Sequence, residues 1–358
     1  MVIEPQIRYY LGANSPTGFY SLYDELMDPA EAAGIYILKG GPGCGKSTLM
    51  RRVAQQAEDA GLKVEYIPCS GDPDSLDAVL LPDQKIALVD GTAPHVVEPK
   101  YPGVVEQYVN LGECYDRTGL GDVRKEIMGA MKGYKACYAR AYRCLDAAGE
   151  IAADVRSLVT TPAVEAKIAK RAKGILSREV RKTGGGEGKV VRRFLSAVTH
   201  KGLLWEFGTV DAQCRRVYEL SDGYGIGHLM LAHLLAGAVA AGHDVIACPS
   251  PMDPDRLEHL LIPGLSLAFV TSTPAHPYPG RPYRRIRMDA MADPEAVKRN
   301  KARLRFSRKV SAALMDEAVD SLAQAKSMHD GLEALYNPYV DFDKVHAVAD
   351  RVAKEILA

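Results

Sequence analysis

The chain has 358 residues, with a hydrophobic fraction of 47% and a charged fraction of 25%, which are typical of a globular protein with one large domain or two smaller ones. Lysine plus arginine equals aspartate plus glutamate at 45 each, so the net charge does not favour nucleic acid or an acidic membrane surface as a partner. The sequence has no signal-peptide pattern, no apolar run near the roughly 20 residues that cross a bilayer, and seven scattered cysteines, so we expect a cytoplasmic protein with reduced thiols and no membrane partner.

Alternating strands and helices are predicted for the first third of the chain. Strands are expected at 35–38, 64–67 and 85–90, where aliphatic and β-branched residues predominate. A helix follows the first strand and ends near Gly61, and a short helix over 72–80 separates the second strand from the third. This alternation predicts a parallel sheet with right-handed crossovers.

A glycine-rich segment, which we call the first loop, lies between the first predicted strand and the helix that follows it. Its residues, in G-x-x-x-x-G-K-[ST] spacing, are Gly40, Gly41, Pro42, Gly43, Cys44, Gly45, Lys46, Ser47 and Thr48. The glycines allow a tight turn that directs backbone N–H groups inward as an anion cradle, and the helix adds its positive N-terminal end. Lys46 is expected to reach the β- and γ-phosphates of a nucleotide, and the Ser47 hydroxyl to ligate Mg²⁺. The alternative is a glycine-rich turn without a ligand.

Long helical segments follow the predicted sheet. Helical periodicity runs over 122–159, breaks at Thr161-Pro162 and resumes over 163–181. We expect these two helices to form a hairpin on their own α/β unit, with residues 182–189 as a flexible connection to the rest of the chain.

The second half of the chain repeats the first. Residues 218–231 align with 36–49 at an offset of 182 residues (228 − 46). Further matches at an offset of 181 residues (242 − 61) include His276, which aligns with His95. So many matches at nearly one offset indicate a tandem duplication.

The duplication predicts two α/β units, 1–186 and 187–358. Each is expected to be a three-layer α/β/α unit of the P-loop NTPase type with a parallel sheet. A helical hairpin of its own follows each sheet, at about 122–181 in the first unit and at about 293–357 in the second.

The segment 222–229, which we call the second loop, keeps the turn but loses the reactive side chains. Glycines remain at 223, 225 and 227, while the lysine and the hydroxyl are replaced by His228 and Leu229. Asp222 stands at the position of the first glycine and brings a carboxylate close to any bound phosphate. The second loop is therefore expected not to bind a Mg²⁺-nucleotide.

Two further residues are candidates for chemistry at the first loop. Asp90 ends the predicted strand 85–90, where an acidic ligand of Mg²⁺ belongs, and the alternative is a solvated turn. The next residue is Gly91, not the glutamate that activates water in many ATP hydrolases, so fast hydrolysis is not expected. His95, on the loop after that strand, is a candidate to orient water or to sense the γ-phosphate. Its persistence as His276 in the second unit favours a structural role as the alternative.

Three other features carry alternatives. Cys44 lies inside the first loop, where oxidation would obstruct a phosphate, and a small filler is the other interpretation. Basic clusters leave a nucleic-acid path open, although few aromatic residues are interleaved with them. A solvated face or an arginine finger directed at the first loop are the alternatives for Arg281, Arg284, Arg285 and Arg287.

Three segments of the first unit carry a family resemblance, namely 12–19, 38–48 and 87–95. On these segments the chain resembles bacterial P-loop ATPase-like proteins that are built from two tandem P-loop units and whose physiological role is not established. The resemblance implies ATP binding and hydrolysis with Mg²⁺, but no pathway. In such relatives the second loop can also look intact, so the degenerate loop at 222–229 departs from the pattern.

Three functional hypotheses follow. The first is a Mg²⁺-dependent ATPase with a single competent site in the N-terminal unit. The second is a kinase that transfers the γ-phosphoryl group to a small-molecule or nucleotide acceptor, and the third is a nucleotide-gated interaction protein with an unknown protein partner and no turnover. ATP is favoured over GTP only because the sequence has no N-K-x-D motif.

Overall fold

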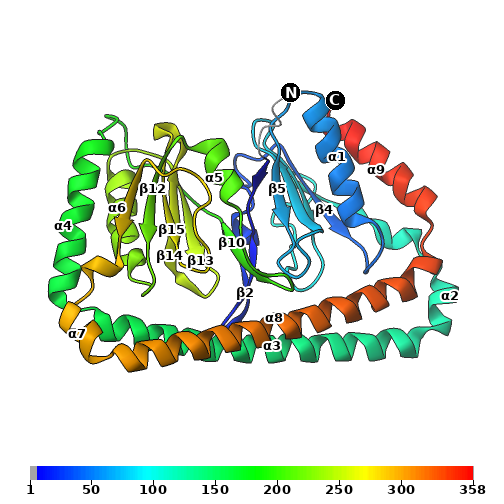
Figure 1. The fold of residues 1–358 in the computed structure, drawn as a ribbon. Coiled ribbons are helices and arrows are strands. Elements are labelled where there is room, and N and C mark those ends of the chain that lie inside the picture. Colours follow the sequence, from blue (N-terminus) through cyan, green and yellow to red (C-terminus); the bar gives the residue numbers. More distant parts are fainter. Residues whose placement is uncertain (1–5, 358) are drawn as a thin grey trace.

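The computed structural model describes residues 6–357, which form two α/β units beside each other (Figure 1). Two long helices, α3 (Arg124–Val159) and α8 (Lys301–Tyr336), run beneath both units as a pair. Among the described residues, no helix combines the length and the apolar character that crossing a membrane requires.

The first unit is built on a six-stranded sheet. Its strands, in spatial order, are β1 (Ile7–Arg8), β5 (Glu65–Pro68), β6 (Leu76–Leu81), β7 (Ile86–Asp90), β4 (Gly34–Lys39) and β8 (Glu106–Asn110). Strand β6 runs antiparallel to both of its neighbours, whereas β4 is parallel to β7 and β8. The sheet is therefore mixed, and the prediction of a parallel sheet is wrong.

The segment predicted as a helix over 72–80 forms strand β6 instead. All residues of β6 are buried between β5 and β7, whereas a helix packed beside a sheet keeps an exposed face. The turn before β6 is closed by Asp72, whose carboxylate accepts hydrogen bonds from Asp74 N at 3.2 Å and from Ser75 Oγ at 3.0 Å. This turn reverses the chain at once, so the apolar run that follows it pairs with β5.

The second unit has a sheet of the same order. In order from the edge that corresponds to β1, its strands are β9 (Val190–Arg192), β13 (Val245–Ser250), β14 (Asp253–Ile262), β15 (Leu267–Ser272), β12 (Arg216–Ser221) and β16 (Arg284–Arg287). Strand β14 is antiparallel to β13 and β15, as β6 is to its own neighbours. The predicted duplication is thus confirmed at the level of the sheets.

Shorter elements complete the two units. In the first half of the chain they are the hairpin β2 (Gly12–Ser15) and β3 (Gly18–Ser21), the helices α1 (Lys46–Asp59) and α2 (Arg117–Asp122), and the 3-10 helices η1 (Tyr23–Glu25) and η2 (Leu111–Cys114). In the second half they are the hairpin β10 (Ser196–Thr199) and β11 (Gly202–Trp205), the helices α5 (Phe207–Gln213), α6 (Gly227–Ala240) and α7 (Pro294–Arg299), and the 3-10 helices η3 (Pro263–Leu265) and η4 (Asp289–Met291).

The helices predicted as hairpins are exchanged between the units. Helix α3 packs antiparallel along α8, so that Arg140 pairs with Glu317 at 2.6 Å and Asp154 pairs with Arg303 at 3.1 Å. A buried stripe of small and aliphatic side chains joins the two helices, and it includes Ala141, Leu145, Ala318 and Leu322.

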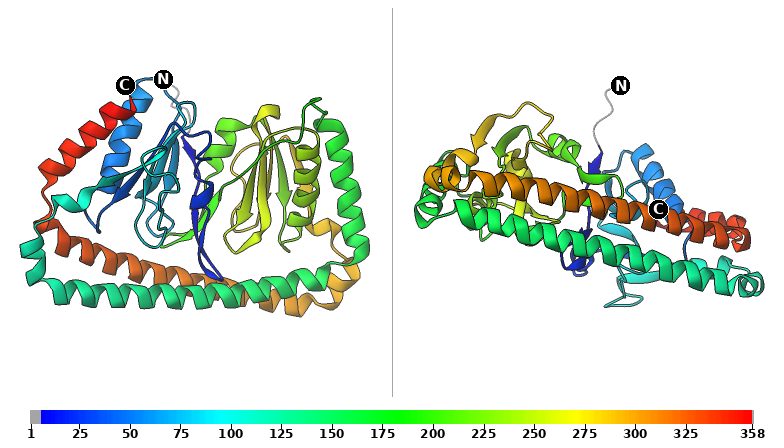
Figure 2. Two further views of the ribbon diagram at one scale, coloured as in Figure 1. Left: turned by 180° about the vertical axis from the view of Figure 1, so that it is seen from behind. Right: turned by 60° about the horizontal axis from the view of Figure 1, so that its bottom comes forward.

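Each long helix carries the chain to the other unit (Figure 2). After α3, the Thr161 hydroxyl caps α4 (Pro162–Glu179), which packs on α6 of the second unit. After α8, η5 (Asn337–Tyr339) leads to α9 (Phe342–Ile356), which packs on α1 of the first unit. The hairpins predicted at 122–181 and 293–357 are therefore wrong, while the division between residues 186 and 187 stays a prediction.

The two sheets face each other across a shared core. Because alternate residues of a strand point to opposite faces, Leu38 packs under α1 and α9 whereas Ile37 enters the core between the sheets. In the second unit Phe269 packs under α4 and α6, and Val270 enters the same central core. Helix α5 and the two hairpins lie between the sheets (Figure 1). The two predicted α/β/α units are thus replaced by one helix–sheet–sheet–helix assembly.

A reciprocal contact of equivalent residues joins the two units at the centre. Tyr10 N donates to Phe194 O at 2.8 Å, and Phe194 N donates to Tyr10 O at 2.9 Å. Each residue lies two positions before its hairpin, so the pairing is that of a local two-fold axis. Arg193 adds a buried ion pair with Glu65 at 2.9 Å and donates to Leu26 O at 3.1 Å.

Phe194→Ala tests the shared core, because the Phe194 side chain is fully buried. We expect this substitution to lower the free energy of unfolding by about 3–5 kcal/mol and to shift both units together. Phe306→Ala, at a phenylalanine that is 66% exposed, is the matched control and should stay within about 0.5 kcal/mol of the wild type. Denaturant unfolding, followed by Trp205 fluorescence and by circular dichroism, measures the unfolding free energy of both variants. A loss at Phe194→Ala as small as that at Phe306→Ala would argue against a core shared by the two units.

Candidate functional site

The first loop connects β4 to α1 at the C-terminal edge of three adjacent parallel strands. Strand β4 lies between β7 and β8, and ligands of α/β sheets bind at such an edge. Two glycines of the loop have left-handed backbones, with φ of 70° at Gly43 and 82° at Gly45. A Cβ atom at Gly40 would meet Cys44 Sγ at 2.5 Å. The turn therefore needs glycine at these positions.

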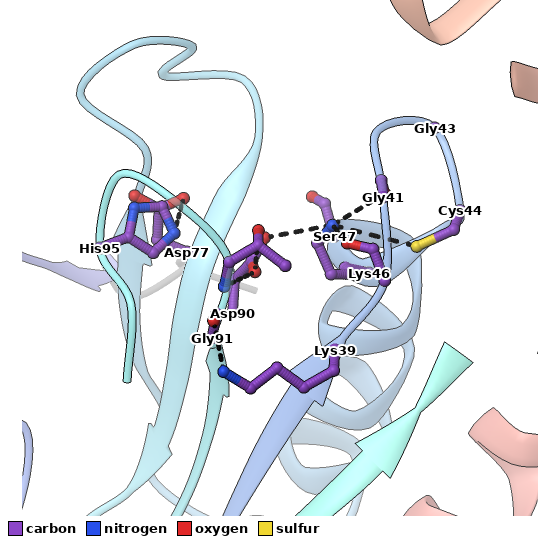
Figure 3. A network of polar contacts seen from close by, with 12 residues as sticks. Lys39, Gly41, Gly43, Cys44, Lys46, Ser47, Asp77, Asp90, Gly91 and His95 are labelled. Atoms are coloured by element: carbon purple, nitrogen blue, oxygen red, sulfur yellow. Dashed lines mark hydrogen bonds and ion pairs between the residues drawn. The ribbon is translucent and has the colours of Figure 1, made fainter. Parts of the chain in front are cut away.

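Lys46 and Asp90 are brought together at this edge (Figure 3). Lys46 Nζ lies 3.6 Å from Asp90 Oδ2 and donates to the carbonyl oxygens of Gly40 and Gly41 at 2.8 and 2.9 Å. Both side chains are largely buried, with exposures of 11% and 12%. The lysine thus folds back over the loop and holds its positive charge beside the carboxylate.

Asp90 is a buried acid and not the solvated turn residue of the alternative interpretation. Its Oδ1 atom accepts hydrogen bonds from Thr92 N at 2.9 Å and from Thr92 Oγ1 at 2.6 Å. One oxygen therefore fixes the carboxylate while the other faces Lys46. At the equivalent position of the second unit, Thr271 donates its hydroxyl to Glu258 O at 2.6 Å.

The other side chains of the loop make structural contacts. Ser47 Oγ accepts from Leu76 N at 3.0 Å and so ties α1 to β6, and its predicted role as a Mg²⁺ ligand stays a prediction. Pro42 is partly buried and Thr48 is exposed. Cys44 is buried, and this burial raises the pKa of its thiol although Lys46 opposes the shift. This environment favours the interpretation of Cys44 as a small filler.

His95 lies in a buried cluster beside the loop and apart from Lys46 (Figure 3). Its ring stacks on Tyr23 at 4.8 Å between centroids, and its Nε2 atom lies 3.6 Å from Asp77 Oδ1. Tyr23 donates its hydroxyl to Asp77 Oδ2 at 2.7 Å. Burial raises the pKa of the Asp77 carboxyl, and His95 opposes that shift.

The same stack occurs in the second unit, where His276 lies on Trp205 with ring centroids 5.5 Å apart. This repetition favours the structural alternative for His95, whose predicted role at the γ-phosphate stays a prediction. Asp77 was missed because it lies in the segment predicted as a helix. An acid inside the apolar run 76–81 is the signal that could have marked it.

The end of α8 reaches the first loop, from about 290 positions away in the sequence. Gly43 N donates to Glu333 Oε1 at 3.2 Å. Asn337, with its amide oriented to satisfy both neighbours, donates to Gly43 O and to Glu333 O at 3.2 Å each. Tyr336 packs beside Gly41. Sequence reasoning missed these residues because the predicted hairpin placed α8 on the second unit, and no motif marks them.

The second loop holds carboxylates in its own turn. Asp222 Oδ1 accepts from Ile226 N at 3.0 Å, and Asp222 Oδ2 accepts from Gly227 N at 2.6 Å. Asp289 Oδ1 accepts from Gly223 N at 2.7 Å. These bonds already use backbone N–H groups of the turn, and the absence of nucleotide binding at the second loop stays a prediction.

The arginines considered as fingers lie along or just before β16, at the edge of the second sheet opposite to β9. Arg285 pairs with Glu219 at 2.6 Å, and Arg284 lies over the ring of Tyr283 at 5.3 Å. These contacts of Arg284 and Arg285 are with residues of the second unit, and the arginine finger stays a prediction.

Comparisons of the chain with protein-family models, with curated proteins and with solved structures found no match. The function is therefore inferred from the residues of the site.

The Asp222 carboxyl gives a pH test of the second loop. Burial raises the pKa of Asp222 from its ordinary value of 3.8 to about 6. The folded chain therefore binds this proton more tightly than the unfolded chain does, so the group stabilises the fold at low pH and loses this contribution as the pH rises through about 6.

We expect the wild type to lose up to about 3 kcal/mol of unfolding free energy between pH 4 and 7 relative to Asp222→Asn. Denaturant unfolding of both proteins at several pH values across this window measures the difference. If the unfolding free energies of the two proteins change in parallel with pH, the raised pKa of Asp222 is contradicted.

Proposed function

We propose that the chain binds ATP with Mg²⁺ at the first loop and hydrolyses it slowly, at a single site. The observation that carries this proposal is the position of Lys46 Nζ, 3.6 Å from Asp90 Oδ2, beside a glycine turn and the N-terminus of α1. A cation, a fixed carboxylate and backbone N–H groups at a helix N-terminus are the groups that a phosphate and its metal ion need.

The residues present fit a phosphate and a magnesium ion. The left-handed backbones of Gly43 and Gly45 are of the kind with which successive backbone N–H groups can form an anion-binding concavity. The Ser47 hydroxyl and the Asp90 carboxylate are oxygen ligands, which Mg²⁺ prefers. A bound Mg²⁺ would neutralise charge on the phosphate oxygens and so assist transfer of the γ-phosphoryl group to water, with ADP as the leaving group.

Lys46 has to change partners when a phosphate binds. Its Nζ atom donates to the neutral carbonyls of Gly40 and Gly41, and a charged phosphate oxygen is a stronger acceptor than either. Asp90 is held by hydrogen bonds from Thr92 to its Oδ1 atom. The carboxylate therefore keeps its place when Lys46 moves to the phosphate. The loop N–H groups then bind and orient the phosphate.

Slow turnover is proposed because Gly91 follows Asp90 and His95 is packed between Tyr23 and Asp77. Phosphate release without an added acceptor separates the ATPase from the kinase alternative, which needs a small-molecule or nucleotide acceptor.

The nucleotide-gated alternative is favoured by one observation, the contact of Gly43 with Glu333 on α8, since this helix spans both units.

Lys46→Ala is expected to weaken Mg²⁺-ATP binding by about 10- to 100-fold, because it removes a charged hydrogen bond to the phosphate. His228→Ala, at the equivalent position of the second loop, is the matched control and should bind like the wild type. Isothermal titration calorimetry measures the dissociation constants, and release of inorganic phosphate measures turnover. Unchanged binding by Lys46→Ala, or an equal loss in both variants, would place the site elsewhere.

A further inference from the structure

The Glu333 carboxylate lies on the anion cradle of the first loop. Gly43 N donates to Glu333 Oε1 at 3.2 Å, and Gly43 belongs to the turn whose N–H groups are proposed to bind phosphate. An N–H group makes one good hydrogen bond, so the Gly43 donor serves either the carboxylate or a phosphate oxygen. The carboxylate and the phosphate are both anions, so they would repel each other if both lay at the Gly43 N–H group.

The last turn of α8 is seated on the loop by more than this bond. Asn337 bridges Gly43 O and Glu333 O, one turn further along the chain. Tyr336 and Tyr115 both pack beside Gly41 of the loop, with their ring centroids 5.7 Å apart. Displacement of Glu333 therefore disturbs a cluster of contacts at the point where α8 passes into η5 and then α9.

The second loop shows a permanent version of the same arrangement. The Asp222 carboxylate is buried, comes from the loop itself and accepts from two backbone N–H groups, at Ile226 and Gly227. Glu333 is partly exposed, comes from a distant helix and accepts one loop N–H group at 3.2 Å, and His329 Nδ1 lies 3.8 Å from the same oxygen. Both turns thus hold a carboxylate, and the one at the first loop is more exposed and accepts from fewer backbone N–H groups.

We propose that Glu333 is a displaceable internal anion at the first loop, and that a bound triphosphate removes it and releases the last turn of α8. This proposal rests on the proposed function of the loop. Nucleotide occupancy is thereby linked to α8, which packs along α3 into the second unit, and to α9, which covers α1.

Removal of the competing charge tests this proposal. We expect Glu333→Ala to tighten the dissociation constant of Mg²⁺-ATP about tenfold, as expected from the loss of one competing charged hydrogen bond. Glu333→Gln keeps the size of the side chain and removes its charge, so it should fall between the alanine variant and the wild type. Asp320→Asn, at an exposed acid of α8 about 20 Å along the helix from Glu333, is the matched control and should change the constant less than about twofold.

Hydrogen–deuterium exchange of the wild type gives a second readout. Mg²⁺-ATP should increase amide exchange over 333–341, and Lys46→Ala should suppress that increase. Thermal unfolding of each variant without nucleotide checks that the fold is retained.

Three outcomes overturn the proposal. Weaker or unchanged ATP binding by Glu333→Ala shows that the carboxylate does not compete. Unchanged binding with loss of phosphate release assigns Glu333 to hydrolysis instead. If neither the wild type nor Glu333→Ala binds Mg²⁺-ATP at millimolar concentration, the proposed function itself fails, whereas binding by Glu333→Ala alone supports both proposals.

Discussion

The antiparallel packing of α3 against α8 is the contact on which the arrangement of the whole molecule depends. It directs α4 onto the second sheet and α9 onto the first, so each sheet is covered by a helix from the other half of the chain. It also brings the end of α8 to the first loop, where Glu333 meets Gly43. The candidate site is therefore assembled from both halves, because the first half supplies the loop and the second half supplies what covers it.

The two loops show how one backbone turn can be kept while its chemistry changes. Both retain their glycines and both use backbone N–H groups as donors to a carboxylate. In the second loop the acceptor is Asp222, which is part of the turn, is buried in it and accepts from two of its backbone N–H groups. In the first loop the cation Lys46 and the fixed acid Asp90 remain, and the carboxylate comes from a separate helix. This contrast is the physical basis for proposing one nucleotide site.

Local patterns made part of this structure predictable. The glycine turn, Lys46 and Asp90 were found because their spacing and the strand before them are local features of the sequence. Strand β6 was misassigned because a short buried apolar run has no periodicity that separates strand from helix. Thr161 and its proline marked the end of α3 correctly, but apolar stripes do not specify whether a helix packs on its own unit or on the other. Glu333 had no local signal in the sequence, because its contact with Gly43 forms only when α8 packs across both units.

The number of nucleotides bound per chain tests the central claim most directly. Native mass spectrometry of the purified chain, titrated with ATP and Mg²⁺, counts bound nucleotides without assuming a mechanism. The account predicts saturation at one nucleotide per chain in the wild type. Saturation at two would mean that the second loop binds despite Asp222, and an absence of binding at millimolar ATP would contradict the assignment of the first loop.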